Sequence, residues 1–399
     1  MAEPVHPFVA TVDGARHAAY DELNRQGPIH RMTVPAGGEA WMVTSYQVAR
    51  VALQDPRLVK SPAGGGPYNG QLPTEITSAI DRHLLASDPP DHGRLRRLVS
   101  AAFTRRRSEL LAPRIQQLTD DLLDALPGHG PGPVDLITEF AYPLPITVIC
   151  ELIGIPERDR GQFRGWTGPL VGGRMAGFQA YSAALTAFVG YLRDLLADKR
   201  RNPADDLLSA LLAVRDEGDR LSEDELTSMV FLLLIAGHET TVNLIANGAR
   251  ALLTHPDQLA ALRDEPDRLG AAVEELLRFD GPLQSALPLQ AAAELELGGR
   301  RISAGETVVI SLLAANRDRS RLPDADQLDL LRPETTANLA FGHGIHYCLG
   351  APLARLEGRI ALGSLITRFP KLRLAVPAAD LARTPGLLMN GLVDLPVLL

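Results

Sequence analysis

The sequence predicts a mostly α-helical protein with small β-sheets. Five segments place apolar residues at the spacing of one helix face, which is typical of amphipathic helices. Short β-branched runs, and an alternating run before a Gly-Gly turn, predict the minor β part. The predicted helices are Ser108 to Leu126, Gln179 to Lys199, Asp205 to Val214, Ala260 to Arg278 and Leu353 to Phe369. The predicted strands are Trp41 to Thr44, Glu294 to Leu297 and Thr307 to Ile310.

Composition favours one soluble globular domain over residues 1–399. Hydrophobic residues make up 45% and charged residues 22% of the 399 residues, which is enough apolar material for a substantial core. No Gly/Ser linker, charge block or internal repeat divides the chain. The net charge of -8 argues against a nucleic-acid partner. We therefore expect a single-domain protein, without nucleic acid, that is a monomer.

Cysteine usage and the N-terminus indicate a cytoplasmic protein. The two cysteines, Cys150 and Cys348, are too few for a disulfide framework. Cys150 lies in an apolar run and is interpreted as a buried small hydrophobe. The start Met-Ala-Glu-Pro lacks a signal pattern, and the longest apolar run, Met229 to Gly237, is too short to span a bilayer. We expect no membrane anchor.

A long helix is predicted to begin at Ser222, because Ser222 and Glu225 form a capping-box pattern, and to end at His255-Pro256. Its middle, Phe231 to Ala236, is apolar all round, which is typical of a buried helix. Two glycine-rich stretches, Ser61 to Gly70 and Gly165 to Gly177, are predicted to be loops that carry ligand contacts.

The long helix contains polar residues in apolar surroundings. Ala236, Glu239 and Thr240 share one helix face, and the small side chains of Ala236 and Gly237 leave room for a diatomic ligand. The alternative is structural: the Thr240 hydroxyl bonds the carbonyl of residue 236, and a neighbour satisfies Glu239. His238 is interpreted as a packing or hydrogen-bonding residue.

The most informative stretch is Phe341-Gly-His-Gly-Ile-His-Tyr-Cys-Leu-Gly350. Its glycines permit close approach of a planar ligand, and Phe341 can pack against the Cys348 sulfur. The helix predicted after the loop would place that sulfur near a helix N-terminus, where the dipole favours a thiolate. Zinc bound by His343, His346 and Cys348 is an alternative, but the spacing fits no usual zinc site.

This decapeptide resembles the haem-binding signature of the cytochrome P-450 superfamily, in its soluble bacterial class that tailors polyketides and other secondary metabolites. The resemblance implies haem b (iron protoporphyrin IX), with Cys348 as the axial iron ligand. It also implies catalytic roles for Glu239 and Thr240 as the acid-alcohol pair that relays protons and orients water. The other haem-contacting positions that it implies are His92, Arg96, Ala236, Gly237, Phe341, Gly342, His346 and Gly350.

Two further motifs match in order. Glu275 and Arg278 reproduce a Glu-x-x-Arg pair that in this superfamily locks the core beneath the haem. His92 and Arg96, one helical turn apart, match a segment that binds the haem propionates, as does His346.

Two departures from the family pattern stand out. Leu289 occupies the position of another propionate-binding arginine, and Gln327-Leu328 replaces an Arg-Phe pair. The first leaves the propionate free to move or to rely on water, and the second removes the charged partner that braces Glu275 and Arg278.

The resemblance implies a P-450 fold, a triangular prism in which the haem lies between the long helix and the cysteine loop. It implies insertion of one oxygen atom from dioxygen into a sizeable apolar substrate, with macrolide hydroxylation or epoxidation as the leading hypothesis. Oxidative coupling or desaturation without oxygen insertion is the alternative, and a haem-based sensor is a remote one. Five mainly aliphatic segments are expected to contact the substrate: Gly65 to Leu85, Trp166 to Phe178, Leu232 to Ala236, Leu283 to Leu287 and Leu388 to Leu392.

Electrons are expected from NAD(P)H through a ferredoxin reductase and a ferredoxin. A basic cluster in this acidic chain is expected to border the face on which a small acidic ferredoxin docks. A solvated helix face is the alternative for this cluster. It consists of Arg94, Arg96, Arg97, Arg105, Arg106 and Arg107.

Overall fold

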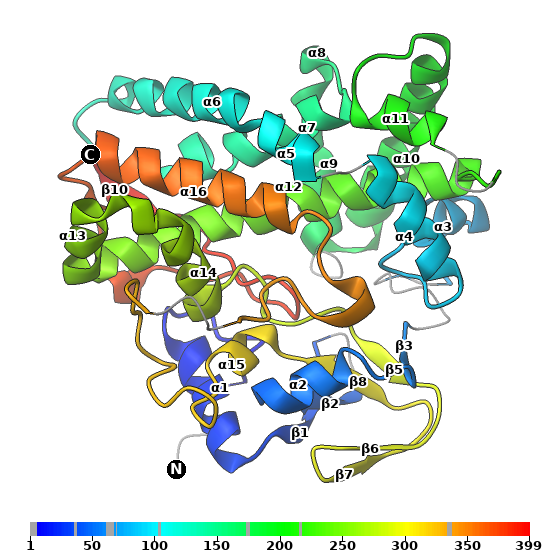
Figure 1. The fold of residues 1–399 in the computed structure, drawn as a ribbon, viewed down its shortest axis with the longest axis horizontal. Coiled ribbons are helices and arrows are strands. Elements are labelled where there is room, and N and C mark those ends of the chain that lie inside the picture. The colour runs from blue at the N-terminus through cyan, green and yellow to red at the C-terminus, as the bar shows by residue number, and fades with distance from the viewer. Residues whose placement is uncertain are drawn as a thin grey trace. The chain divides into compact units, whose positions relative to one another are not determined.

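A computed structural model describes residues 6–35, 38–60, 68, 70–102, 105–172, 176–214, 218–332 and 337–399. The chain forms two compact units, and Figure 1 shows the ribbon. Unit 1 comprises Met1–Val59, Glu109–Leu144 and Thr240–Leu399. Unit 2 comprises Lys60–Ser108 and Pro145–Glu239.

In its described residues, unit 1 combines three small sheets with α-helices. Its strands are β1 (Ile29–Thr33), β2 (Glu39–Val43), β3 (Leu58–Val59), β4 (Val134–Asp135), β5 (Leu289–Ala291), β6 (Leu295–Leu297), β7 (Arg300–Ile302), β8 (Thr307–Ile310), β9 (Arg373–Leu374) and β10 (Pro396–Leu398). Its α-helices are α1 (Ala15–Gln26), α2 (Tyr46–Ala52), α6 (Ala112–Ala125), α13 (Pro256–Asp264), α14 (Leu269–Asp280), α15 (Leu312–Asn316) and α16 (Ala351–Arg368). Short 3-10 or π turns are η1 (Leu126–His129), η2 (Ile137–Ala141), η4 (Pro266–Arg268), η5 (Gly344–His346) and η6 (Ala378–Asp380).

The largest sheet has the strand order β1-β2-β8-β5-β3. β2 and β8 pair in parallel, with Trp41 opposite Val308, while the other neighbours are antiparallel. β3 pairs with β5 so that Leu58 faces Ala291 and Val59 faces Gln290. The two smaller sheets are β4-β10-β9 and the β6-β7 hairpin. The alternating run before Gly298-Gly299 thus forms the predicted strand and turn.

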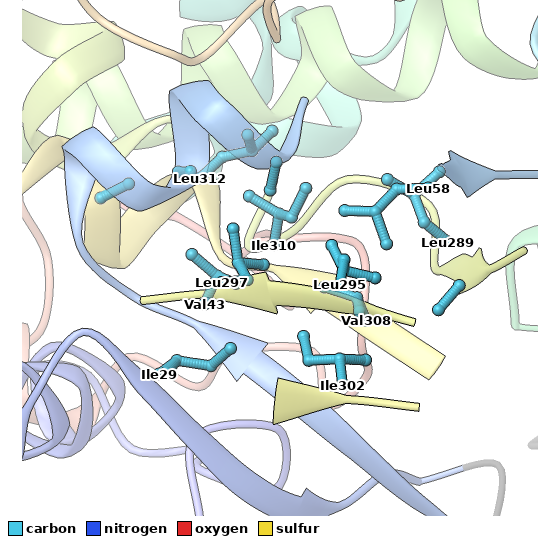
Figure 2. Close-up of a cluster of buried hydrophobic side chains, with 14 of the residues drawn as sticks. Ile29, Val43, Leu58, Leu289, Leu295, Leu297, Ile302, Val308, Ile310 and Leu312 are labelled. Atoms are coloured by element: carbon cyan, nitrogen blue, oxygen red, sulfur yellow. The ribbon is translucent and has the colours of Figure 1, made fainter. Parts of the chain in front are cut away.

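One apolar cluster packs these strands together with α2 and α15. Figure 2 shows Val43, Val308 and Ile310 of the large sheet beside Leu295 and Leu297 of the hairpin. All five side chains are buried. Leu289, at the start of β5, lies in the same cluster near Leu58. Burial of these aliphatic side chains is the main term that stabilises this part of the unit.

Unit 2 is helical in the residues that the structure describes. Its elements are α3 (Thr74–Asp81), α4 (Asp91–Ala102), most of α5 (Arg105–Leu110) and of α7 (Pro143–Ile153), α8 (Glu157–Arg160), α9 (Phe163–Gly172), α10 (Phe178–Arg201) and α11 (Leu207–Ala213). α10 packs against α3, α9 and α11. Tyr181, Leu185 and Val189 of α10 form a buried cluster with Ile76 and Ile80 of α3.

Helix α12 (Glu223–Thr254) runs from unit 2 into unit 1. The predicted capping box is confirmed, because the Ser222 amide donates to Glu225 Oε2 at 2.7 Å and the Glu225 amide donates to Ser222 Oγ at 3.3 Å. Within the described residues, α12 alone is long and apolar enough to cross a membrane, although its uninterrupted apolar run is short. However, 56% of its most apolar stretch is buried, as is typical of a helix in a protein core.

Three predicted elements were wrong in detail. The segment Ser108 to Leu126 was predicted as one helix, but it is divided at Leu111 between α5 and α6, just before Pro113, which lacks a backbone donor. The segment Ala260 to Arg278 was predicted as one helix, but it is divided into α13, η4 and α14 at Pro266, where proline removes a backbone donor. Gly165 to Gly177 was predicted as a loop, yet its first half lies in α9, and residues 173–175 lie outside the described residues. In the other predicted loop, residues 61–67 and 69 also lie outside them.

The helical state of α9 has a tertiary cause. Trp166 stacks on Phe188 of α10 with ring centroids 5.4 Å apart, and Phe163 meets Phe188 edge-on at 5.5 Å. Such aromatic contacts bury large apolar areas and add specific ring attractions. They outweigh the weak helix propensity of Gly165, Gly168 and the internal Pro169.

A buried charge network ends α14. Asp280 accepts hydrogen bonds from Arg383 Nη2 at 2.6 Å, Asn390 Nδ2 at 2.8 Å and His17 Nε2 at 3.0 Å. Burial alone would raise the pKa of Asp280, but the Arg383 charge and the His17 hydrogen bond hold it well below its ordinary value. Burial, followed by the charge of Arg317, lowers the pKa of His17 to about 4. His17 is therefore a neutral donor to Asp280 at neutral pH.

Stability should fall between about pH 6.5 and pH 4. Because the pKa of His17 is lowered in the folded state, His17 of the unfolded chain becomes protonated at a higher pH than His17 of the folded protein. Protonation therefore favours the unfolded chain, and the stabilisation present above pH 6.5 is lost as the pH falls toward 4. The expected loss in unfolding free energy is about 1–3 kcal/mol. Denaturant unfolding of wild type and of His17→Gln at pH 7 and pH 5 measures this loss. The unfolding free energy of the variant should decrease less between the two pH values than that of wild type.

His129→Gln is the matched control, because the side chain of His129 is 42% exposed. Its pH dependence should equal that of wild type. If the unfolding free energy of His17→Gln changed with pH as much as that of wild type, the assignment of this pH dependence to His17 would be contradicted.

Candidate active site

The cysteine loop lies in unit 1 and is fixed by its own backbone. The Gly342 amide donates to Leu339 O at 2.8 Å, and the Cys348 amide donates to Phe341 O at 3.0 Å. Gly342 and Gly344 have φ of 74° and 73°, a region that favours glycine. Cys348 is an exposed thiol that is not part of a disulfide, whereas Cys150 is buried as predicted. The loop therefore presents one thiol just before α16, whose N-terminal dipole favours negative charge.

Arg355 of α16 holds this loop from one side. Its guanidinium lies over the Phe341 ring at 4.4 Å and donates to the Tyr347 hydroxyl at 3.2 Å. Arg355 Nη2 also donates to Glu274 of α14 at 3.1 Å, and the Glu274 hydrogen bonds raise the pKa of Arg355. Asn338 Nδ2 donates to the same Glu274 carboxylate at 3.1 Å. The loop is thus joined to both α14 and α16, and nothing in the motif signalled Arg355.

Glu275 and Arg278 form the predicted pair. Arg278 donates to both carboxylate oxygens of Glu275 at 2.7 Å, and both side chains are buried. Gln327 was expected to leave this pair without a charged brace, and that expectation was wrong. Arg332 supplies the charge, because its Nε lies 3.3 Å from Glu275 Oε1 while its Nη1 binds Asp324 at 3.0 Å. Gln327 contributes its backbone carbonyl instead, which accepts a hydrogen bond from Arg278.

The polar turn of α12 contains His238 and Glu239. Burial raises the pKa of Glu239, so this carboxyl retains a proton to higher pH than usual. His238 is fully buried, and its Nδ1 donates to Leu234 O at 2.7 Å, which confirms the predicted packing and hydrogen-bonding role. Its Nε2 lies 3.7 Å from Glu239 Oε2. A methyl group at Gly237 would approach Ile149 to 3.2 Å, so the turn is closely packed there.

Two of the predicted substrate segments lie side by side within unit 1. Leu283 and Met389 form a β-bridge, and the Gln284 amide donates to Leu388 O at 2.7 Å. On α12, one turn after Thr240, Asn243 Nδ2 lies 4.0 Å from Met389 Sδ. The structure therefore brings Leu283–Leu287 and Leu388–Leu392 to the same stretch of helix that carries Thr240.

His92 and Arg96 lie on α4 of unit 2, four residues apart as the sequence predicted. His92 is buried, and burial followed by the Arg96 charge lowers its pKa. Arg96 Nη1 is buried and has no hydrogen-bond partner among the described residues. A buried guanidinium nitrogen without a partner is costly, so this position fits an acidic group from outside the chain.

The basic cluster is less free than its sequence suggests. Arg94 donates to Asp219 at 3.0 Å and to Glu225, so its charge is paired within unit 2. Arg97 and Arg106 are exposed, while the side chains of Arg105 and Arg107 lie outside the described residues.

A zinc site receives no support. No group of three or more His, Cys, Asp or Glu side chains suited to hold a metal ion occurs in the described part of the chain. Cys348 as a single ligand remains the interpretation that suits the loop.

The loop should not tolerate a side chain at Gly344. A methyl group there would lie 2.6 Å from the Leu53 carbonyl oxygen, in addition to the strain of a φ of +73°. Gly299 also has a φ of +74°, but a methyl group there would meet no atom within 4 Å. Gly299→Ala is therefore the control, and it should cost only the backbone strain of about 1 kcal/mol. Gly344→Ala should lower the unfolding free energy by about 1–3 kcal/mol more, measured by denaturant unfolding. Equal losses would contradict the contact with Leu53.

Arg332→Met should destabilise the protein by about 3–5 kcal/mol, because it removes one partner of the buried Glu275 carboxylate. The control is Arg319→Met, since the Arg319–Asp326 pair is exposed and should contribute under about 1 kcal/mol. Thermal or denaturant unfolding distinguishes the two. A loss below about 1 kcal/mol for Arg332→Met would show that Arg332 does not brace Glu275.

Comparison with known proteins agrees with this geometry. A family model described as "Cytochrome P450" matches residues 178–375. The chain is 49% identical to "Cytochrome P450 107B1" of Saccharopolyspora erythraea, over 96% of this chain and 94% of that protein. It is 42% identical to "6-deoxyerythronolide B hydroxylase" of the same organism, over 96% and 95%. The structure of the tirandamycin C-bound P450 monooxygenase TamI superposes with a TM-score of 0.87 at 45% identity, covering 97% of this chain and 98% of that one.

These likenesses confirm the predicted P-450 fold and the predicted enzyme class, a cytochrome P-450 monooxygenase. Because relatives this similar cover nearly the whole chain, the protein belongs to the cytochrome P450 family.

Proposed function

We propose that this protein is a soluble, cytoplasmic haem-thiolate monooxygenase that hydroxylates or epoxidises a polyketide or macrolide. Family membership implies a haem cofactor, an external electron supply and a small-molecule substrate. The observation that carries the proposal is the exposed Cys348 thiol, held by a rigid glycine loop at the start of α16. The whole chain would act as one catalytic domain and as a monomer.

The residues present fit a haem. Cys348 supplies the one exposed thiol among the described residues, and a methyl group at Gly350 would lie only 3.9 Å from its sulfur. Arg96 supplies an unpartnered buried donor suited to a propionate, beside His92. Phe341, Gly342 and His346 belong to the same loop as Cys348 and would contact the porphyrin. When bound, the haem activates dioxygen with two electrons and two protons.

The chain itself would supply position and protons. The small side chains of Ala236 and Gly237 would leave room beside this turn of α12 for a diatomic ligand. Glu239, whose pKa is raised by burial, would hold a proton beside Thr240, and the Thr240 hydroxyl would orient water. Glu275 and Arg278 would act structurally, by fixing the segment that leads to the cysteine loop.

Two observations support the proposed substrate class: the compounds named for two relatives, and the aliphatic side chains of the two segments joined by the Leu283–Met389 bridge. One relative is a 6-deoxyerythronolide B hydroxylase, and the TamI structure contains tirandamycin C. In this chain the segments Leu283–Leu287 and Leu388–Leu392 carry mainly aliphatic side chains next to the Thr240 stretch of α12. A sizeable apolar ligand suits such a surface.

Electrons would come from NAD(P)H through a ferredoxin reductase and a ferredoxin. Arg97 and Arg106 of the basic cluster are exposed at the surface, where their positive charge would attract an acidic ferredoxin. The reduction rate would then fall steeply as ionic strength rises.

The test is a titration of the purified ferric protein with macrolides, linear polyketides, steroids, fatty acids and aromatic amino acids. A saturable low-to-high-spin shift with a macrolide or polyketide, followed by an oxygenated product, is the expected result. A shift and product only with another class would overturn the substrate proposal, and a reduced carbon monoxide complex without the thiolate signature would overturn the haem-thiolate proposal.

Glu239→Gln should lower the rate of product formation on the order of 10²-fold, because the amide cannot release a proton. Haem content and substrate affinity should stay unchanged. The control Thr241→Ala changes a neighbouring buried residue outside the proposed relay and should retain the rate. Product assays with supplied redox partners measure both, and a wild-type rate in Glu239→Gln would remove Glu239 from the relay.

A further inference from the structure

The five residues Gly386–Asn390 form a turn whose backbone carbonyls are all bound by other segments of unit 1. Gln284 binds three of them, because its Nε2 donates to the carbonyls of residues 386 and 389 at 2.8 and 3.0 Å and its amide donates to that of residue 388 at 2.7 Å. Ser285 Oγ donates to the carbonyl of residue 387, and Asn247 Nδ2 donates to that of residue 390 at 2.7 Å. The turn belongs to no helix or strand, so these partners set its position.

The Gln284 side chain has a single orientation that satisfies its surroundings. It is fully buried, and the two carbonyls that it binds can only accept, so its NH2 group must face them. Its Oε1 then accepts from the hydroxyl of Tyr20 in α1 at 3.2 Å. Tyr20 is fully buried as well. Any rotation of the amide would leave buried polar groups unpaired, which is costly.

The turn places Met389 against α12. Met389 Sδ lies 4.0 Å from Asn243 Nδ2, and a methyl group at Gly391 would lie 2.6 Å from Asn243 Oδ1. Asn243 follows Thr240 by three residues, so the two are neighbours on the helix surface. A displacement of the turn would therefore move Met389 relative to the part of α12 that carries Thr240.

Burial separates the residues that hold the turn from those that the turn presents. The side chains of Gln284, Ser285 and Asn390 are buried. Leu388 and Met389 are only half-buried, although both are large and apolar. A rigid polar frame that presents less buried apolar side chains is the arrangement expected of a ligand-binding surface.

We propose that Gln284 is a positioning residue of the substrate site, whose side-chain amide fixes the Gly386–Asn390 turn and so determines which apolar ligands fit beside Met389 and Thr240. The inference rests on the haem site and the substrate segments proposed above. Gln284 acts through the turn and need not touch the substrate. A change at Gln284 should therefore alter the fit of a ligand without altering the haem.

The experiment measures the binding of imidazole and of 4-phenylimidazole to the ferric, haem-loaded protein by the shift of its Soret band. Both azoles bind the iron through a ring nitrogen, but only 4-phenylimidazole carries an apolar ring that must also fit the substrate site. Gln284→Met keeps the length of the side chain and removes both donors. Its Kd for 4-phenylimidazole should rise roughly tenfold, because the turn loses two hydrogen bonds, while its Kd for imidazole should stay within about twofold of wild type.

The comparison of the two azoles separates positioning from folding. A purely structural role of Gln284 would leave both affinities of the folded protein unchanged, and that result would overturn the proposal. An equal rise in both Kd values would overturn it too, because it would show a general change at the haem. Wild-type protein that binds imidazole but not 4-phenylimidazole would show that no apolar ring fits beside the turn, with the same consequence.

The matched control is Gln116→Met, the same substitution at a half-buried glutamine of α6 in unit 1. Gln116 Nε2 donates to Asp120 at 3.1 Å and to Ser364 at 3.0 Å, and neither partner belongs to the turn. Both azoles should bind this variant as they bind wild type. Tenfold weaker binding of 4-phenylimidazole would show that the loss of any such glutamine has this effect, and the proposal would fall.

Tyr20→Phe keeps the proposal testable if Gln284→Met does not fold. The substitution removes only the hydroxyl that orients the Gln284 amide and retains the buried ring. It should weaken the binding of 4-phenylimidazole roughly threefold and leave that of imidazole unchanged. Unchanged binding of 4-phenylimidazole to Tyr20→Phe would contradict the role assigned to the amide.

The two proposals fail in different ways. Wild-type protein that retains no haem, or whose reduced carbon monoxide complex lacks thiolate ligation, would overturn the proposed function and this inference with it. Wild-type protein with both properties that binds both azoles, together with unchanged affinities in Gln284→Met and Tyr20→Phe, would overturn this inference alone.

Discussion

The architecture of unit 1 depends on the burial of one fully satisfied guanidinium. Arg278 is 1% exposed, and all five of its N–H donors have acceptors. Two bind Glu275, and three bind the carbonyls of Asn316, Ala325 and Gln327. A buried charge lacking any of these partners would destabilise the fold by several kcal/mol, on the order of 3–5. The helix, the end of α15 and the following segment must therefore keep one arrangement.

Hydrogen bonds connect the cysteine loop to the segments that Arg278 holds together. Asn316, whose carbonyl is bound by Arg278, uses its own side chain to accept from the Leu339 amide at 2.6 Å. The Leu339 carbonyl then accepts from Gly342, at the start of the loop that contains Cys348. On the other side, Arg355 joins the loop to α14. These hydrogen bonds thus fix the position of the exposed thiol.

Buried charge serves different purposes in the two units. In unit 1, Arg383 and Asp280 compensate each other and fix the chain end that bears Met389 near α12. In unit 2, Arg96 keeps a buried guanidinium nitrogen without a partner among the described residues. A closed network stabilises a fold, whereas an unbalanced one favours a ligand of opposite charge. This difference separates the supporting residues of the site from those suited to bind a cofactor.

Local sequence determined the elements whose signals are local. The capping box at Ser222, the Gly298-Gly299 turn and the helix after Cys348 follow from residues within a few positions of each other, so they were predictable. The cysteine loop and the Glu275–Arg278 pair were predictable for the same reason, since their residues are close in the sequence.

Tertiary structure alone decided the features that join distant segments. α9 is helical because Trp166 packs on α10, against the preference of its glycines and proline. Arg332 braces Glu275 from 57 positions away, and the Asn316 side chain accepts from the Leu339 amide across 23 positions. Such partners are chosen by packing and charge compensation across the fold, and these act over distances that no local pattern in the sequence encodes.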